Sequence, residues 1–305
     1  MPLDPQIEIV LEALRGRPGL RDVPLEILRN MPLPPMGEIS EMAEVRDVLI
    51  PAEPAPIPAR LYRPEARRDL PLLVYYHGGG FALGSIESHD AICRRLAFIG
   101  GFAVLSVGYR LAPEHKFPAA PDDALRALLW ATEAANELGI DPSRIAVGGD
   151  SAGGNLAAVT AVRARDESDV SLAAQLLIYP AVSHHTPPTA SIIENAEGYF
   201  LGRDDMEYFM SLYLPDEAAT RHPHYAVMKT PDLGGLPPAY VITAQYDPLR
   251  DEGKAYAARL REEGVAVETV HYDGMIHGFY GMAGVDVGRE ALDLSAEWLR
   301  GIFAA

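Results

Sequence analysis

Short, almost wholly apolar segments alternate with amphipathic helical patterns along most of this 305-residue chain. LPLLVYY (70–76) and GFAVLSVGY (101–109) are two such apolar runs, and HDAICRRLAFIG (89–100) between them has a helical pattern. A strand that is apolar on both sides is typical of a parallel sheet, because helices cover both faces of such a sheet. The alternation therefore predicts an α/β protein with a mostly parallel sheet between two layers of helices.

The same rhythm continues to the C-terminal end of the sequence. VRDVLI (45–50) and IPARLYRP (57–64) alternate apolar and polar residues, and they predict a pair of antiparallel strands. The remaining predicted strands are 145–149, 173–180, 239–245 and 265–272, and the remaining predicted helices are 124–139, 153–167, 252–264 and 288–303.

Two regions do not follow this rhythm. Residues 1–42 contain two helical patterns and a proline-rich stretch, and residues 183–231 interrupt the alternation. An insertion of this size in a compact sheet domain is usually functional, typically a lid or a binding element. We predict a body of residues 43–182 and 232–305, capped by the N-terminal helices and the insertion within one structural unit.

The composition of the chain limits the binding partners and the kinds of site that we expect. A formal net charge of −17 argues against nucleic acid or an anionic membrane as partner, because both need basic patches. The single cysteine, Cys93, excludes an internal disulfide framework and a cysteine-rich zinc site. The opening MPLDPQIEIVLEAL has no basic region of a secretory signal, and no apolar run approaches the roughly 20 residues of a membrane-spanning helix. We expect a soluble, cytoplasmic protein.

GGDSAGGN (148–155) contains the pattern G-x-S-x-G as Gly149, Ser151 and Gly153. A predicted strand leads into it and a predicted helix leads out, which is the context that gives this short motif its meaning. Such a turn holds the serine in a strained backbone conformation with its Oγ exposed, and its neighbours must be small. Ser151 is therefore the candidate nucleophile.

HGGGF (77–81) ends an apolar strand with a histidine and three glycines. Bare backbone N–H groups of this kind hold either a phosphate or the oxyanion of an acyl-transfer intermediate. A phosphate site is not supported. GGDSAGGN lacks the Lys-Ser/Thr pair that ends a P-loop, and in HGGGFALGS the third glycine position of a dinucleotide fingerprint falls on Leu83. The motif thus predicts an oxyanion hole with Gly78, Gly79 and Gly80 as candidate donors.

A serine nucleophile needs a base and a carboxylate that orients the base. In this strand-turn-helix arrangement the chain order is serine, acid, histidine, with the last two in loops after late strands. Asp247 and His277 meet this order. Asp247 lies just past the predicted strand 239–245, and His277 lies in the loop after the predicted strand 265–272. We interpret the rival Asp251 as an N-cap of the following helix, and His271 as a packed residue within a strand.

The other histidines are weaker candidates for a catalytic or metal-binding role. His184–His185 and His222-Pro-His224 are adjacent or i,i+2 pairs without nearby carboxylate or thiol ligands, so we expect no metal site. His77 is tied to the glycine loop and is expected to hold its backbone in shape.

Five ordered motifs, HGGGF, YRLAPEHKFPAA, GDSAGGNLA, DPLRDEG and IHGF, resemble the hormone-sensitive-lipase group of α/β-hydrolases, and within it the microbial carboxylesterases. The resemblance covers essentially the whole chain. It implies an eight-stranded sheet with a helical cap, and Ser151, His277 and Asp247 as nucleophile, base and orienting acid. It also implies that the backbone N–H groups of Gly79, Gly80 and Ala152 are the oxyanion donors.

The implied activity is hydrolysis of short- to medium-chain carboxylic esters through an acyl-enzyme, without a cofactor. Phe81, together with Tyr208, Phe209 and Leu212 of the insertion, is a candidate lining of the substrate pocket, although packing alone also explains an apolar helix face. Two alternatives stay open. One is amide or arylacetamide-type deacylation on the same residues, and the other is a non-catalytic small-molecule receptor. The sequence also leaves open whether two copies form a homodimer.

Overall fold

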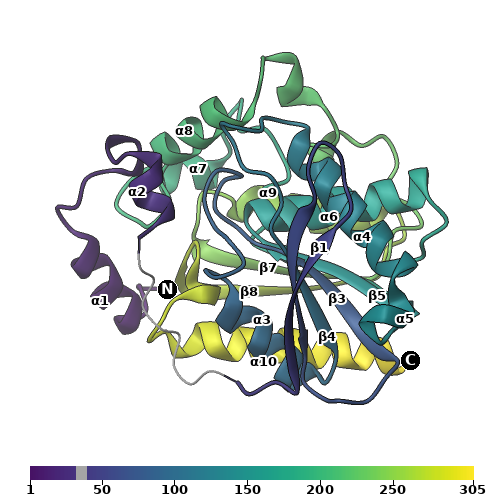
Figure 1. Cartoon of the computed structure of the whole chain (residues 1–305). Coiled ribbons are helices and arrows are strands. Elements are labelled where there is room, and N and C mark those ends of the chain that lie inside the picture. The colour runs from purple at the N-terminus through teal and green to yellow at the C-terminus, as the bar shows by residue number, and fades with distance from the viewer. Residues whose placement is uncertain (32–39) are drawn as a thin grey trace.

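The computed structural model describes residues 1–31 and 40–305, in which eight strands form one sheet (Figure 1). Along the sheet these strands follow the order β1-β2-β4-β3-β5-β6-β7-β8. The pairs β1–β2 and β2–β4 are antiparallel and all other pairs are parallel, which confirms the predicted fold class. The bounds are β1 (Glu44–Ile50), β2 (Ile57–Arg63), β3 (Leu70–Tyr76), β4 (Ala103–Val107), β5 (Ile140–Asp150), β6 (Ala174–Ile178), β7 (Ala239–Tyr246) and β8 (Val267–Ile276).

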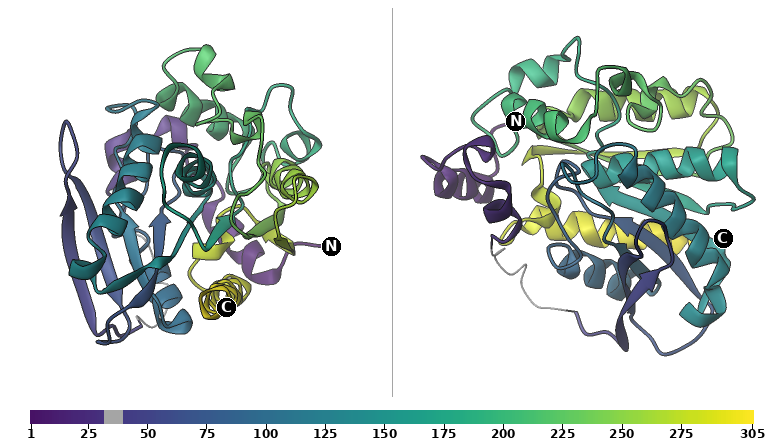
Figure 2. Two further views of the ribbon diagram at one scale, coloured as in Figure 1. Left: turned by 90° about the vertical axis from the view of Figure 1, so that its right-hand side faces the viewer. Right: turned by 45° about the horizontal axis from the view of Figure 1, so that its top comes forward.

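Helices cover both faces of the sheet and create two separate apolar cores (Figures 1 and 2). One core lies against α4, α6 and α9, and the other against α3 and α10. Every residue of β3 is buried, as its unbroken apolar run predicts, whereas burial alternates along β1. The helix bounds are α1 (Pro5–Leu14), α2 (Leu25–Arg29), α3 (Asp90–Gly100), α4 (Ala119–Glu133), α5 (Ala135–Leu138), α6 (Ala152–Glu167), α7 (Ala190–Glu194), α8 (Arg203–Tyr213), α9 (Arg250–Glu262) and α10 (Asp286–Ala304).

Several element ends differ from the prediction. The helix expected over 124–139 begins five residues earlier, because prolines are tolerated in a first helical turn, and it is divided at Ala134 into α4 and α5. Gly139 ends it in a left-handed conformation at φ +67°, as a terminal glycine predicts. Helix α8 of the insertion stops at Tyr213, because Pro215 forces extended backbone on Leu214.

The insertion and the N-terminal helices lie on the same side of the molecule (Figures 1 and 2). An exposed ion pair of 3.1 Å joins Arg21, in the short 3-10 turn after α1, to Asp204 of α8. This contact supports a common cap, which stays a prediction. Residues 32–39, part of the predicted N-terminal cap, lie outside the described residues. Within the described ranges, no helix combines the length and the apolar character needed to span a membrane.

The close packing of α6 beneath β3 depends on glycine. A Cβ at Gly153 would overlap the carbonyl oxygen of Tyr76 and lie 2.7 Å from that of His77. A Cβ at Gly149 would also overlap the carbonyl oxygen of Tyr76. The backbone can approach this closely only without side chains, so these two glycines determine how near the start of α6 lies to the end of β3.

We expect Gly153→Ala to lower the free energy of unfolding by about 3 kcal/mol or more, because backbone atoms that cannot rotate away must shift. Urea unfolding followed by circular dichroism measures the change. Gly301→Ala is the matched control, since nothing lies within 4 Å of its Cβ position in α10. That control should be slightly more stable than the wild type. Equal stability of Gly153→Ala and the wild type would contradict the packing argument.

Candidate active site

Ser151 occupies a sharp turn between β5 and α6. Its backbone has φ +56° and ψ −117°, a strained combination for a residue with a side chain. A hydrogen bond of 2.9 Å from its N–H to the carbonyl of Ile178 holds the turn against the neighbouring strand. The strained strand-to-helix turn predicted from G-x-S-x-G is therefore present.

Ser151, His277 and Asp247 form one continuous hydrogen-bonded chain. Ser151 Oγ lies 2.9 Å from His277 Nε2, and His277 Nδ1 lies 2.8 Å from Asp247 Oδ2. An Nδ1–H that donates to the carboxylate leaves Nε2 as the acceptor for the serine hydroxyl. Asp247 is fully buried and its second oxygen accepts the N–H of Leu249 at 2.8 Å, so the carboxylate is held on both sides.

The parallel sheet explains why these three residues meet. Ser151 follows β5, Asp247 follows β7 and His277 follows β8, and the carboxyl ends of parallel strands lie along one edge. Residues more than 120 positions apart in the chain are thereby brought within hydrogen-bond distance.

The rival acid has a different role from the one predicted. Asp251 is not the N-cap of α9, because the helix begins at Arg250 with Leu249 as its cap residue. Its carboxylate instead accepts the N–H of Ser191 at 2.8 Å and pairs with the Arg250 side chain. His271 lies within β8, as expected, with its Nδ1 2.9 Å from Thr243 Oγ1.

The HGGG loop requires one correction. The N–H of Gly78 donates to Asp150 Oδ1 at 3.1 Å, so this group is occupied and Gly78 does not fit its predicted place among the oxyanion donors. By contrast, the N–H groups of Gly79, Gly80 and Ala152 have no acceptor among the described residues. Ala152 is the first residue of α6, where backbone N–H groups lack an intrahelical partner.

Asp150 organises this loop, and the sequence analysis did not single it out. Its carboxylate also accepts the Tyr75 hydroxyl at 2.8 Å and lies 3.2 Å from His89 Nε2. Burial disfavours the charged form, but His89 and Tyr75 outweigh it, and the pKa of Asp150 is below its ordinary value. The carboxylate is so close to Gly78 that a Cβ there would overlap it. An acid between a buried strand and the nucleophile was the available sequence clue.

His77 supports the same loop from within. Its ring stacks on Tyr109 with centroids 4.3 Å apart, and the Tyr109 hydroxyl donates to the His77 carbonyl at 2.8 Å. Burial, helped by the nearby His89, lowers the pKa of His77 to about 4, so the imidazole is neutral near pH 7.

The four predicted pocket residues have different surroundings. The Phe209 ring lies directly against Gly80, where a Cβ would overlap it. Phe81 is buried and stacks on Tyr213 with ring centroids 4.0 Å apart. Leu212 is partly buried and packs against the apolar core on this face of the sheet, while the half-buried Tyr208 lies beside Phe209 with centroids 5.9 Å apart. Phe209 thus has the contact that best fits a pocket wall.

Two aromatic residues near the histidine were missed by sequence reasoning. The Tyr179 ring lies 4.6 Å from the His277 ring, centroid to centroid. The Phe200 ring lies 3.2 Å from the position a Cβ of Gly278 would take, just after the histidine. Neither belongs to a motif, so no local pattern marks them.

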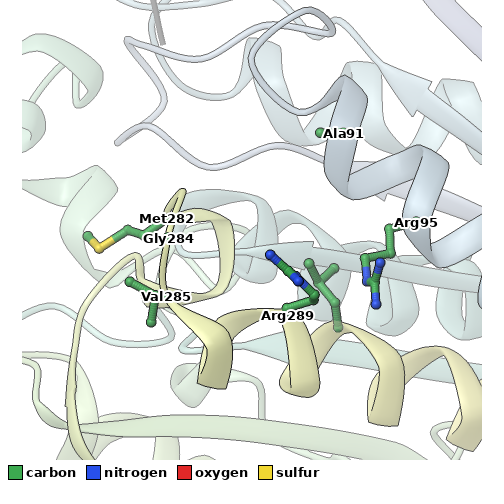
Figure 3. Close-up of a pocket in the computed structure, with 7 residues that line it drawn as sticks. Ala91, Arg95, Met282, Gly284, Val285 and Arg289 are labelled. Carbon is green, nitrogen blue, oxygen red and sulfur yellow. The ribbon is translucent and has the colours of Figure 1, made fainter. Parts of the chain in front are cut away.

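A cavity of about 280 Å³ lies elsewhere, between α3 and α10, and contains none of the predicted site residues (Figure 3). Its two arginines, Arg95 and Arg289, sit among apolar side chains, and Arg95 is paired with Asp293 through two contacts of 2.6 Å. In the described part of the chain, no group of three or more His, Cys, Asp or Glu side chains is arranged to hold a metal ion.

Comparison with known proteins agrees with this fold. Residues 73–281 match the sequence profile of a family described by its alpha/beta hydrolase fold. The chain therefore belongs to the α/β-hydrolases, in their hormone-sensitive-lipase group, and the predicted resemblance is confirmed.

Individual relatives cover much or all of the chain. The carboxylesterase NlhH of Mycobacterium tuberculosis is 47% identical over 231 residues, which cover 74% of this chain and 72% of that protein. An arylesterase of Saccharolobus solfataricus is 39% identical over 293 residues, covering 92% and 93%. The solved structure of a hyperthermophilic esterase from Pyrobaculum calidifontis superposes with a TM-score of 0.92 at 43% identity and covers 100% of both chains.

Glu252 ties the start of the insertion to α9. One of its carboxylate oxygens accepts the N–H of Val182 at 2.7 Å and that of Ser183 at 3.2 Å. Burial raises the pKa of Glu252 to about 8, although the two N–H groups act in the opposite direction. The folded protein therefore keeps a proton on this carboxyl at pH values where the unfolded chain has lost it.

This pKa predicts how stability varies with pH. A pKa raised from 4.5 to about 8 makes the folded state lose stability as pH rises through this interval. Glu252→Gln keeps an oxygen for both N–H groups and carries no charge, so the decline in melting temperature between pH 5 and 9 should be smaller in this variant. Glu262→Gln, an exposed glutamate of the same helix, is the control and should follow the wild type. Parallel curves for all three proteins would contradict the prediction.

Proposed function

We propose that this protein is a serine carboxylesterase that hydrolyses short- to medium-chain esters. One observation carries the proposal: a hydrogen-bonded chain from Ser151 through His277 to Asp247, beside three backbone N–H groups without an acceptor among the described residues. Relatives named carboxylesterase and arylesterase support it. No single element of this arrangement would be sufficient, because the nucleophile, the base and the oxyanion donors must act on the same carbonyl group.

The proposed chemistry has two steps. His277 Nε2 takes the hydroxyl proton as Ser151 Oγ attacks the ester carbonyl, and Asp247 stabilises the imidazolium that forms. The N–H groups of Gly79, Gly80 and Ala152 stabilise the negative oxygen of the tetrahedral intermediate. His277 then gives its proton to the leaving alcohol, and a water molecule repeats the sequence on the acyl-enzyme. Each proton transfer uses a residue of this chain, and the scheme includes no cofactor.

The contact between Phe209 and Gly80 suggests the size of the acyl group. A ring against the oxyanion loop restricts the space beside the carbonyl that the loop would hold. We infer that the site prefers short or medium acyl chains to those of long-chain triglycerides. The same residues would also permit amide hydrolysis, and a matched ester and anilide pair distinguishes the two activities.

We expect the hydrolysis of p-nitrophenyl esters with acyl chains of two to sixteen carbons to peak at short or medium length. Ser151→Ala should lower kcat by at least about 10³-fold, because the nucleophile is lost while the fold is kept. The readout is nitrophenolate release, with unfolding curves as the control for structure. Absence of turnover by folded wild-type protein would overturn the proposal in favour of ligand binding without chemistry. If activity instead rises steadily with acyl chain length and is highest on triolein emulsions, only the inferred preference for short or medium chains is overturned.

Phe209→Ala should shift the preferred acyl chain towards greater length by removing the wall beside Gly80. We expect the ratio of kcat/KM for ten-carbon and four-carbon esters to rise about tenfold, the scale of discrimination by an apolar pocket. Phe98→Ala serves as the control, since Phe98 is an exposed residue of α3 on the other face of the sheet. An unchanged ratio in Phe209→Ala would remove Phe209 from the acyl site.

A further inference from the structure

The order of strands places the residue after β6 next to the imidazole of His277. Strand β6 lies between β5, which leads to Ser151, and β7, which leads to Asp247. His277 comes from beyond β7 and hydrogen-bonds to both of these residues, so its ring must extend over the carboxyl end of β6. The residue that follows β6 is Tyr179.

Tyr179 is in contact with the histidine. Its ring centroid lies 4.6 Å from that of His277, and the two ring planes are inclined by 55°. Tyr179 is 2% exposed, and its ring also lies beside that of Phe279, with centroids 6.0 Å apart. A buried ring this close limits the orientations that the imidazole can take.

The backbone of Tyr179 is strained, and hydrogen bonds to neighbouring strands hold it in place. Its φ of +35° is unusual for a residue with a large side chain. Its N–H donates to the carbonyl of Ile242 in β7 at 2.8 Å, and the preceding carbonyl, of Ile178, accepts the N–H of Ser151. Tyr179 is thus fixed to the strands that carry both hydrogen-bond partners of His277. Strain of this kind persists where the surrounding structure enforces it, and it is common at functional sites.

The phenol group does not ionise near neutral pH. Burial, with the nearby carboxylates Asp150 and Asp247 and the Tyr280 phenol, raises the pKa of Tyr179 well above its ordinary value. The hydroxyl stays protonated and does not serve as a base, and the ring is the part of the side chain that contacts the imidazole of His277.

We propose that Tyr179 is a positioning residue whose ring holds the imidazole of His277 in the plane that joins Asp247 to Ser151. This inference rests on the proposed function. A base that is free to rotate would spend part of its time out of line with the serine hydroxyl, and small misplacements at a reacting centre cost up to about 10²-fold in rate. Loss of the ring should therefore lower kcat and leave substrate binding nearly unchanged.

The test compares two substitutions at this position. Tyr179→Phe keeps the ring and should retain kcat within about twofold, whereas Tyr179→Met fills much of the volume without a ring and should lose about tenfold or more in kcat at a nearly constant KM. Tyr256→Met is the matched control, because Tyr256 is a fully buried tyrosine of α9 in the apolar core on the α4, α6 and α9 side of the sheet. A merely structural role would make both Met variants similar in activity and in stability.

A second measurement does not depend on turnover. Proton NMR of the low-field Nδ1–H of His277 reports its hydrogen bond to Asp247. We expect this resonance to broaden and move upfield in Tyr179→Met, and to be unchanged in Tyr179→Phe and Tyr256→Met. If Tyr179→Met does not fold, Tyr179→Asn replaces it, since asparagine tolerates a positive φ and has no ring.

The possible results separate the two proposals. Wild-type kcat together with a wild-type resonance in the ringless variant would overturn the role of Tyr179. Equal loss in Tyr179→Phe and Tyr179→Met would also overturn it, because the hydroxyl would then be the important group. If the wild type hydrolyses no ester, the proposed function fails, and the NMR comparison still decides whether Tyr179 orients the imidazole.

Discussion

The close contact between the start of α6 and the end of β3 is the constraint on which the site depends. Gly153 lies against the carbonyl oxygen of Tyr76, and the chain can turn from β5 into α6 this tightly only because no side chain intervenes. The turn forces Ser151 to φ +56°, which exposes its Oγ, and leaves the N–H of Ala152 at the beginning of a helix. The same approach brings the HGGG loop, which continues from β3, next to the serine. The steric limit at one glycine therefore underlies the positions of nucleophile and oxyanion donors alike.

Two buried carboxyl groups hold the remaining parts of the site in place through hydrogen bonds. Asp150 binds the N–H of Gly78 and the hydroxyl of Tyr75, and Asp247 binds His277 and the N–H of Leu249. Each carboxyl group is removed from water and has more than one hydrogen-bond partner, as buried polar groups require. Because such a network stabilises only one arrangement of its donors, it keeps the loops at the sheet edge in fixed relative positions.

Much of the fold was predictable because it follows from local periodicity. Unbroken apolar runs indicated buried parallel strands, and the alternating 45–50 and 57–64 segments are indeed an antiparallel pair. Predictions were wrong where a single tertiary contact decides the role of a residue. The N–H of Gly78 points to a carboxylate 72 positions away, and Asp251 binds the start of α7 instead of capping its own helix. The direction of an N–H or a carboxylate depends on the backbone around it, and no spacing along the chain encodes that direction.

The sequence by itself determined the class of fold, the turn that carries Ser151 and the glycine loop, since each depends on residues close together in the chain. The order of serine, acid and histidine also follows from the sequence, because it requires only the position of each short motif along the chain. Tertiary structure alone decided which glycine N–H groups have no acceptor among the described residues, that Asp150 holds the loop, and that Tyr179 lies against His277. These features arise where the ends of β3, β5, β6, β7 and β8 converge. Their physical reason is that packing and hydrogen bonding act through space, between residues that have no regular separation in sequence.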